Sequence, residues 1–429
     1  QDHVLRREMR QFEGAWTSDN AIEAGKVRLE RLGYFKEVNV ETIPVPGTDD
    51  QIDIIYNVEE ETTGSIGGNI GYSDFGLMLG FNLQEQNFLG SGNTVGIGIN
   101  KNIYSEMYNI SYMNPYATRD GVSLGYNLYF RETDYGEFNV ANYLTNSNGF
   151  GAQFGYPISD ITRLGFNITY DKTDIDVGSL PAREIYDFVS AEGNIFETLS
   201  AQLSWQRVTL NRGLFPTDGA STVLSFSSTI PGSDLSYYRL NVRQRYYQPL
   251  TQNLVFGFQG ELGYLNAYGD TEETPFFQNF YAGGPRSLRG FESNTLGPRS
   301  TDAPCYEFNY AEGTCPNLLD IDGDGELDTP YYNPYANQTS RYRDAPIGGN
   351  IKIEGSLQLI FKLPFIEDQR SLRSAFFFDF GNVFSDNCKE YQINCSEPSI
   401  DDLRYSYGVG ITWITGFGPM SLAIAKPTN

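Results

Sequence analysis

Apolar and polar residues alternate with a period of two in segment after segment from Gly64 onward. In one such segment Val122, Leu124 and Tyr126 alternate with small or polar residues, and the pattern continues to Phe130. A period of two places successive side chains on opposite faces of a β-strand. The alternation predicts about fifteen strands. They lie near residues 64–73, 75–86, 93–102, 105–113, 121–133, 147–156, 162–173, 186–207, 219–230, 236–248, 253–267, 350–363, 372–384, 403–414 and 419–426.

Two kinds of protein carry this alternation: a soluble β-sandwich, whose polar face meets water, and a membrane barrel, whose apolar face meets lipid. Segment length favours the barrel, because membrane-crossing strands need about 9–11 residues whereas soluble strands average about 5–6. Aromatic residues near the segment ends, such as Tyr104, Tyr116 and Phe276, are typical of interfacial girdles. We therefore predict an antiparallel transmembrane β-barrel with long loops near residues 172–187, 267–348 and 384–403.

Residues 1–61 follow a different pattern, with helical spacing before any strand. Asp2 is placed to cap a helix that runs to Phe12, and Ser18 to cap a second helix that stops at Gly33. Two strands follow, near residues 35–42 and 52–58. The order α-α-β-β predicts a small α+β domain at 1–61. Residues 62–429 then form the barrel, and its long loop spans about 267–348.

Composition narrows the function classes. The chain of 429 residues has a formal net charge of −24 and a mean hydropathy of −0.39. The negative charge argues against nucleic acid as a partner. His3 is the only histidine and lies outside the barrel, so a His-dependent hydrolase site in the barrel is excluded. We expect a protein that is not an enzyme and requires no cofactor.

The four cysteines form two close pairs in sequence. Cys305 lies near Cys315, and Cys388 lies near Cys395. An even number with local pairing predicts two disulfides that close loops in an oxidising compartment. The alternative is four free thiols in a reducing cytosol.

An acidic segment in the long loop has carboxylates at alternate positions, interrupted by glycines. They are Asp320, Asp322, Asp324, Glu326 and Asp328. Oxygen ligands at this spacing can surround a hard cation, so the segment predicts a possible structural calcium site. The position of the closing bidentate Glu in an EF-hand loop is Tyr331 here, which predicts weak affinity. The alternative is a solvated acidic loop.

A glycine-rich stretch at residues 280–298 contains the triplet Arg289-Gly290-Phe291. Gly283, Gly284 and Gly290 permit a tight backbone path. The triplet therefore suits a guanidinium carried on a turn and held inside the protein. The plain interpretation is a Gly/Pro turn with a solvated arginine.

Several stretches together resemble a known family. They are Arg289-Gly290-Phe291, Ser293–Pro298, Arg6–Gln11, Glu13–Trp16 and Leu32–Phe35. They are similar to the BamA family of outer-membrane β-barrel insertases, in which periplasmic POTRA domains precede a barrel. The resemblance implies a sixteen-stranded antiparallel barrel after a β-α-α-β-β POTRA domain. On that pattern the last barrel strand and the first POTRA strand are missing from this chain.

The resemblance also implies a function. Members fold and insert β-barrel proteins into the outer membrane of Gram-negative bacteria without ATP, by strand templating at a lateral gate. The implied partners are unfolded outer-membrane barrel clients, outer-membrane lipid and assembly-machine lipoproteins including BamD, which the position of Glu13 contacts in the family. Rival interpretations are a sibling POTRA-barrel transporter for protein secretion, which has fewer POTRA domains, and a passive porin, which has none.

Specific residues follow from the same resemblance. Arg289 is expected to pair with Asp379. The alternation of side chains along its strand places Asp379 on the inward face. The family's second acidic partner falls on Gln358 here, and Glu354, on the same face of that strand, is expected to substitute. The first barrel strand is implied to form the lateral gate, although its glycines also suit a crowded barrel corner. Its residues of interest are Gly64, Ile66, Gly67, Gly68 and Gly71.

Overall fold

The computed structural model describes most of the chain. The described residues are 2–73, 76–118, 120–138, 140–141, 143–177, 182–301, 345–363, 371–389, 392, 394–415 and 418–428. No helix among them is long and apolar enough to cross a membrane.

The N-terminal module has the predicted order of elements, with α1 (Asp2–Arg6), α2 (Asp19–Arg31), β1 (Phe35–Pro44) and β2 (Ile52–Glu60). The Ser18 hydroxyl accepts a hydrogen bond from the Ala21 amide and caps α2. Gly33, with φ of +69°, follows the end of α2. The prediction that the first helix reaches Phe12 was wrong. That side chain is 72% exposed, so no apolar burial supports further helical turns.

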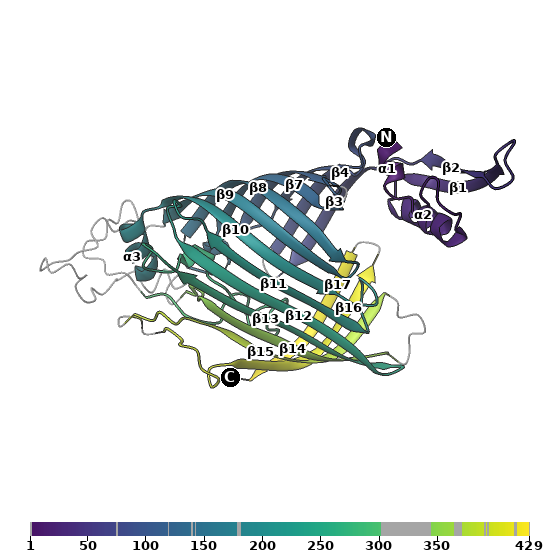
Figure 1. Ribbon diagram of the computed structural model, residues 1–429. Coiled ribbons are helices and arrows are strands. Elements are labelled where there is room, and N and C mark those ends of the chain that lie inside the picture. Colours follow the sequence, from purple (N-terminus) through teal and green to yellow (C-terminus); the bar gives the residue numbers. More distant parts are fainter. Residues whose placement is uncertain are drawn as a thin grey trace, which may run out of the picture.

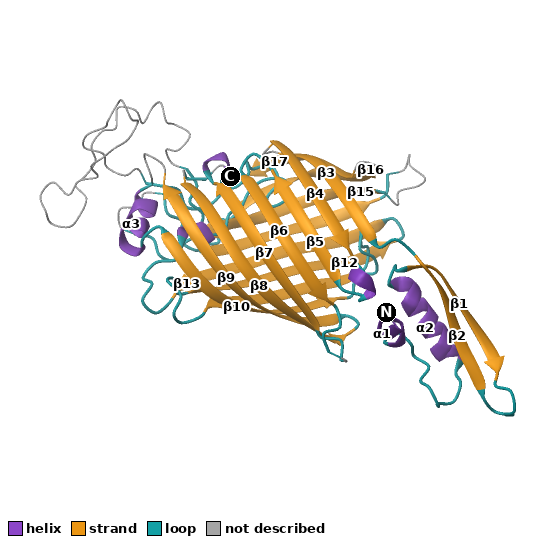
Figure 2. Ribbon diagram, turned by 90° about the horizontal axis from the view of Figure 1, so that it is seen from above, coloured by secondary structure: helices purple, strands orange, loops and turns teal. Residues whose placement is uncertain are grey.

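The remaining strands form one antiparallel sheet of fifteen strands in which each pairs with its neighbours in sequence. Their bounds are β3 Gly64–Ser73, β4 Gly76–Glu85, β5 Thr94–Lys101, β6 Ser105–Asn114, β7 Ser123–Asp134, β8 Tyr143–Ser159, β9 Thr162–Val177, β10 Ile195–Val208, β11 Gly219–Thr229, β12 Tyr237–Thr251, β13 Leu254–Ala267, β14 Ile351–Phe361, β15 Leu372–Phe384, β16 Arg404–Thr415 and β17 Gly418–Thr428. The sheet curls around a lumen, with the N-terminal module at one end (Figures 1 and 2).

The faces of the sheet have the polarity of a membrane barrel. On β15, Phe376 and Phe378 point outward and are 56% and 40% exposed, whereas Phe377 and Asp379 face inward and are buried. Outward apolar side chains recur on the other strands, as at Leu203 of β10. An apolar outer face and a polar lumen are the arrangement that lipid requires.

One predicted strand was partly wrong. The residues before Ile195 were predicted as the start of a strand at 186–207, but they form helix α3 (Arg183–Glu192). Ile185 and Phe188, three residues apart on one helical face, are almost fully buried. They pack in a cluster with Tyr143, Phe196 and Phe276. This cluster and α3 lie at the end of the barrel opposite the N-terminal module (Figures 1 and 2).

Three short 3₁₀ helices complete the described elements: η1 (Phe88–Gly90), η2 (Gly136–Phe138) and η3 (Phe276–Gln278). The third lies in the loop that connects β13 to β14. This loop ends where β14 starts, so both of its ends are fixed by the sheet.

Candidate functional site: the lumen loop and the sheet edges

The stretch 280–298 folds back on itself beside the inner face of the sheet. Bridges join Phe280 to Gly349 and Ala282 to Leu296, so the loop is closed by its own backbone pairing. Leu288 is 1% exposed and packs in a cluster with residues of β13 and β15. The full cluster is Leu265, Phe280, Ala282, Leu288, Leu296 and Val383, with Phe291 packed against it. Apolar packing therefore holds the loop against the wall.

Two glycines are required by this path. Gly283 has φ of +106°, and a Cβ there would lie 2.4 Å from the Glu292 carbonyl oxygen. Gly290 has φ of +93°, and a Cβ there would lie 3.1 Å from Cβ of Ala425 on β17. The tip of the loop thus packs directly on the last strand of the sheet.

Arg289 makes a bidentate ion pair with Asp379. Its Nε donates to Oδ2 at 2.7 Å and its Nη2 to Oδ1 at 2.6 Å. The Arg289 amide also donates to Oδ2, at 3.2 Å. The carboxylate side chain is fully buried, and the guanidinium lies 3.5 Å from the centroid of the Phe377 ring. A bidentate, charge-assisted pair with a stacked ring restricts the arginine to one orientation.

The expected second acidic partner was wrong. Arg289 Nη2 donates to the Ser356 hydroxyl at 2.9 Å, and Gln358 Nε2 donates to the same hydroxyl at 3.3 Å rather than contacting Arg289. Strand register explains this, because Ser356 is the cross-strand partner of Asp379 and Glu354 is paired further along, with Gly381. Ser356 shares a strand face with Gln358 and Glu354, so alternation alone made it a candidate, but only the register between β14 and β15 selects it.

Glu354 anchors the loop through another residue. The Ser287 hydroxyl donates to its carboxylate, and Lys352 Nζ lies 2.9 Å from it. Lys352 also lies 3.6 Å from Glu261 of β13. The loop tip is therefore held at two successive points, Ser287 and Arg289, by inward residues of β14 and β15.

The two edges of the sheet are β3 and β17. Within the described part of the chain, β3 pairs only with β4 and β17 only with β16. Ile66 and Ile70 on β3 are each 76% exposed, and Leu422 on β17 is equally exposed. In the part of the chain that the structure describes, each of these two strands therefore has one side without a paired strand.

The glycines of β3 have unequal surroundings. A Cβ on Gly67 would lie 2.6 Å from Oδ1 of Asn82, and one on Gly64 would lie 2.9 Å from Oε2 of Glu85. A Cβ on Gly71 would approach Met78 at 3.1 Å, whereas Gly68 has its nearest neighbour at 4.0 Å. A side chain at Gly64 or Gly67 would thus displace the end of a β4 side chain, whereas one at Gly68 would meet none.

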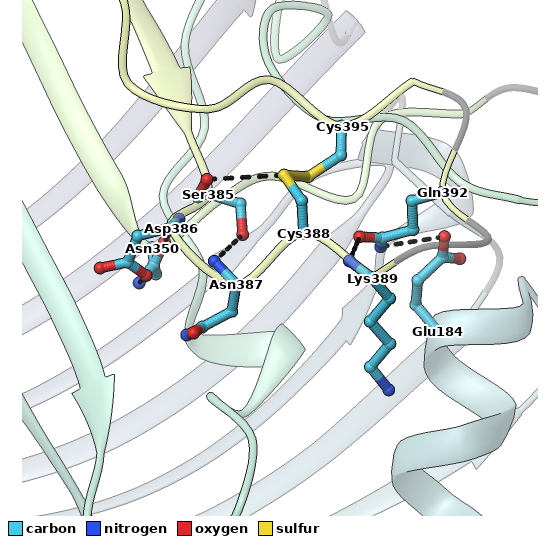
Figure 3. Close-up of a disulfide and its surroundings, with 9 residues drawn as sticks. All are labelled: Glu184, Asn350, Ser385, Asp386, Asn387, Cys388, Lys389, Gln392 and Cys395. Carbon is cyan, nitrogen blue, oxygen red and sulfur yellow. Dashed lines mark hydrogen bonds between the residues drawn. A yellow bond between two sulfur atoms is a disulfide. The ribbon is translucent and has the colours of Figure 1, made fainter.

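Cys388 and Cys395 form a disulfide in the loop after β15 (Figure 3). Gln392, between them in sequence, donates to Glu184 of α3 at 3.2 Å, and Lys389 pairs with Glu273. The loop that the disulfide closes therefore contacts two other segments at this end of the barrel. Cys305, Cys315 and the acidic residues Asp320, Asp322, Asp324, Glu326 and Asp328 lie outside the described residues.

The N-terminal module contacts the barrel beside η1. The Tyr34 hydroxyl donates to the Gly92 carbonyl at 3.4 Å, and the Arg7 guanidinium lies 4.2 Å from the Tyr116 ring centroid. Burial raises the pKa of Tyr34, so the phenol keeps the proton that it donates. Glu13 lies apart from this contact, is exposed, and forms an ion pair with Arg6 at 2.8 Å.

Comparison with known proteins identifies the family. Residues 87–429 match the model of the Omp85 superfamily domain, which covers more than half of the chain. The chain belongs to the Omp85 superfamily. Residues 1–61 match the POTRA model, described as a surface antigen variable number repeat.

Relatives of this Omp85 protein include assembly factors. The outer membrane protein assembly factor BamA of Neisseria meningitidis is 29% identical over 99% of this chain and 52% of its own length. The chain therefore spans about half of that relative. The human sorting and assembly machinery component 50 homolog is 24% identical over 90% of this chain and 73% of its own length.

Solved structures agree with this placement. The crystal structure of BamA from Haemophilus ducreyi lacking POTRA domains 1–3 is 30% identical, with a TM-score of 0.81 over all of this chain and 78% of that chain. CdiB from Escherichia coli is 12% identical, with a TM-score of 0.59 over all of this chain and 70% of that chain. The second likeness shows the shared fold alone.

Proposed function

We propose that this Omp85 protein is the central barrel of an outer-membrane assembly machine of a Gram-negative bacterium, which folds and inserts other β-barrel proteins without ATP. The observation that carries the proposal is the likeness, over nearly the whole chain, to proteins named assembly factors, in a sheet whose first barrel strand, β3, pairs only with β4 among the described strands. The module at 1–61 is then the POTRA domain nearest the barrel, in the periplasm, and residues 62–429 form the barrel in the membrane.

The proposed mechanism uses the open edge as a template. Unpaired backbone N–H and C=O groups within lipid are costly, so an edge strand there will accept an incoming strand. Addition of a client strand to β3 is β-augmentation, in which backbone hydrogen bonds provide the affinity. The Arg289–Asp379 pair keeps the loop tip against β17, the strand at the other end of the described sheet.

The partners follow from this proposal. They are unfolded outer-membrane barrel clients, outer-membrane lipid, and assembly-machine lipoproteins including BamD. Glu13 is exposed at the N-terminal module and is the residue proposed to contact BamD. The rival secretion transporter would carry its substrate through the lumen, where the loop at 280–298 is packed against the wall.

Reconstitution tests the proposed activity. Full-length protein in liposomes is expected to accelerate the assembly of an unfolded client barrel, measured as the fraction that resists SDS without heating. Liposomes that contain a porin of similar size are the control. Equal assembly in both would contradict the proposal, as would translocation of the client into the liposome interior.

We further propose that the acidic loop holds one structural calcium ion, and that Cys305 pairs with Cys315. The double variant Asp322→Asn with Asp324→Asn is expected to abolish the heat of calcium binding in calorimetry, because two of the oxygen ligands lose their charge. The parent affinity is expected in the ~10⁻⁴–10⁻³ M range of extracellular sites. Asp49→Asn with Asp50→Asn, in the exposed turn between β1 and β2, is the matched control. Absence of calcium heat in the parent at millimolar calcium would refute the site.

A further inference from the structure

A cavity of 530 Å³ lies between the loop tip, β15 and the last two strands. Pro285 and Phe291 line it from the loop, Arg373 and Ala375 from β15, and Ala423 from β17. The volume falls within the range of about 300–1,000 Å³ that is typical of small-molecule sites.

The charge in this cavity is opposite to that of the whole chain. Its lining contains Arg289 and Arg373 but no aspartate or glutamate, although the chain carries a net charge of −24. Asp379, an inward residue of β15, neutralises Arg289. Arg373 forms no ion pair with any described residue, so the cavity keeps one uncompensated positive charge.

The Arg373 guanidinium is fixed in place without a carboxylate. Its Nη2 donates to the Pro216 carbonyl, and its Cζ lies 5.0 Å from the Tyr247 ring centroid and 5.4 Å from that of Phe215. These contacts use one edge and the faces of a group that has five N–H donors in a planar fork. Donors are therefore left over for an anion.

The rest of the lining divides into amide or hydroxyl groups and apolar groups. Gln259, Gln358, Thr412 and Ser421 supply the former. Phe215, Phe291, Ala375, Ala423 and Ala425 supply the latter. A preorganised cation beside apolar surface favours a ligand with one carboxylate and a compact apolar body.

We propose that this cavity binds a small amphipathic carboxylate, with its carboxylate on Arg373 and its apolar part toward Phe291 and Ala423. The site is independent of the proposed assembly function, because it requires neither a client nor the open edges. The bound carboxylate would lie between the loop tip and β17.

The test uses 4-fluorobenzoate as the probe with the full-length protein in nanodiscs, followed by fluorine NMR line broadening. The neutral isostere 4-fluorobenzyl alcohol and inorganic phosphate are competitors that carry only one of the two features. Each is expected to bind at least about tenfold more weakly than the benzoate, the ratio that one charge-assisted hydrogen bond provides. Equal binding of the alcohol would overturn the proposal.

Two variants locate the site. Arg373→Gln is expected to weaken 4-fluorobenzoate binding at least about tenfold, and Arg131→Gln, a lumen arginine of β7 outside this cavity, to leave it unchanged. Ala423→Leu keeps the guanidinium but adds bulk at the apolar side of the cavity, and is also expected to weaken binding at least about tenfold. Heat-modifiability verifies that each barrel is folded. Unchanged binding in folded Arg373→Gln or Ala423→Leu protein would refute the assignment.

Discussion

Arg289→Ala will release the tip of the lumen loop and slow client assembly. The substitution leaves Asp379 buried, fully desolvated and without its bidentate partner, and breaking such a pair on one side costs roughly 3–5 kcal/mol. The freed tip no longer packs on Ala425, so β17 loses its support from inside. We expect the assembly rate in liposomes to fall at least about tenfold, the change that about 1.4 kcal/mol produces.

Arg286→Ala is the matched control for this experiment. Arg286 is an exposed arginine of the same loop, three residues away, and its loss should leave assembly unchanged. The double variant Arg289→Ala with Asp379→Ala removes both charges, so its loss should be smaller than the sum of the two single losses. Parental assembly rate and parental heat-modifiability in Arg289→Ala would contradict a positioning role for the pair.

A covalent link between the first and last barrel strands is the second change that we expect to affect client assembly strongly. A disulfide between a cysteine at Ile66 and one on the last strand of the full-length protein would prevent β3 from accepting a client strand. Assembly is expected to stop in the oxidised protein and to return when reductant is added. The Ile66→Cys single variant controls for the substitution itself. Equal client assembly with and without reductant would contradict a role for opening between these two strands.

The strands were predictable because each has two chemically different faces. On β15, Phe376 and Phe378 alternate with inward residues. This alternation shows which side chains face outward and approximately where the strand begins and ends. The large sheet has fifteen strands in the described part of the chain, the number expected from residue 64 onward, and most lie within a few residues of the expected positions. Helix α3 was missed because residues 186–192 were read as the start of a strand and Ile185 as part of the preceding loop, so the short helical spacing of Ile185 and Phe188 went unnoticed.

The loop contacts were only partly predictable. The alternation of side chains along β15 identified Asp379 as an inward residue, because the face that a residue occupies depends only on its own strand. The role of Ser356 depends on the register between β14 and β15, which no single segment contains. The same holds for the cavity at Arg373, which brings together the loop tip, β15 and β17 from distant parts of the chain.

The central claim is that β3 pairs with a client strand during assembly, and cysteine cross-linking measures this pairing directly. Single cysteines along β3, including Ile66→Cys and Ile70→Cys, would be combined with single cysteines in the last strand of a client stalled during assembly. Leu240→Cys, on β12 in the middle of the sheet, is the control because both edges of that strand are already paired. The account predicts cross-links from β3 in one fixed register and none from Leu240→Cys. Cross-links that are absent from β3, or equally frequent at Leu240→Cys, would contradict it.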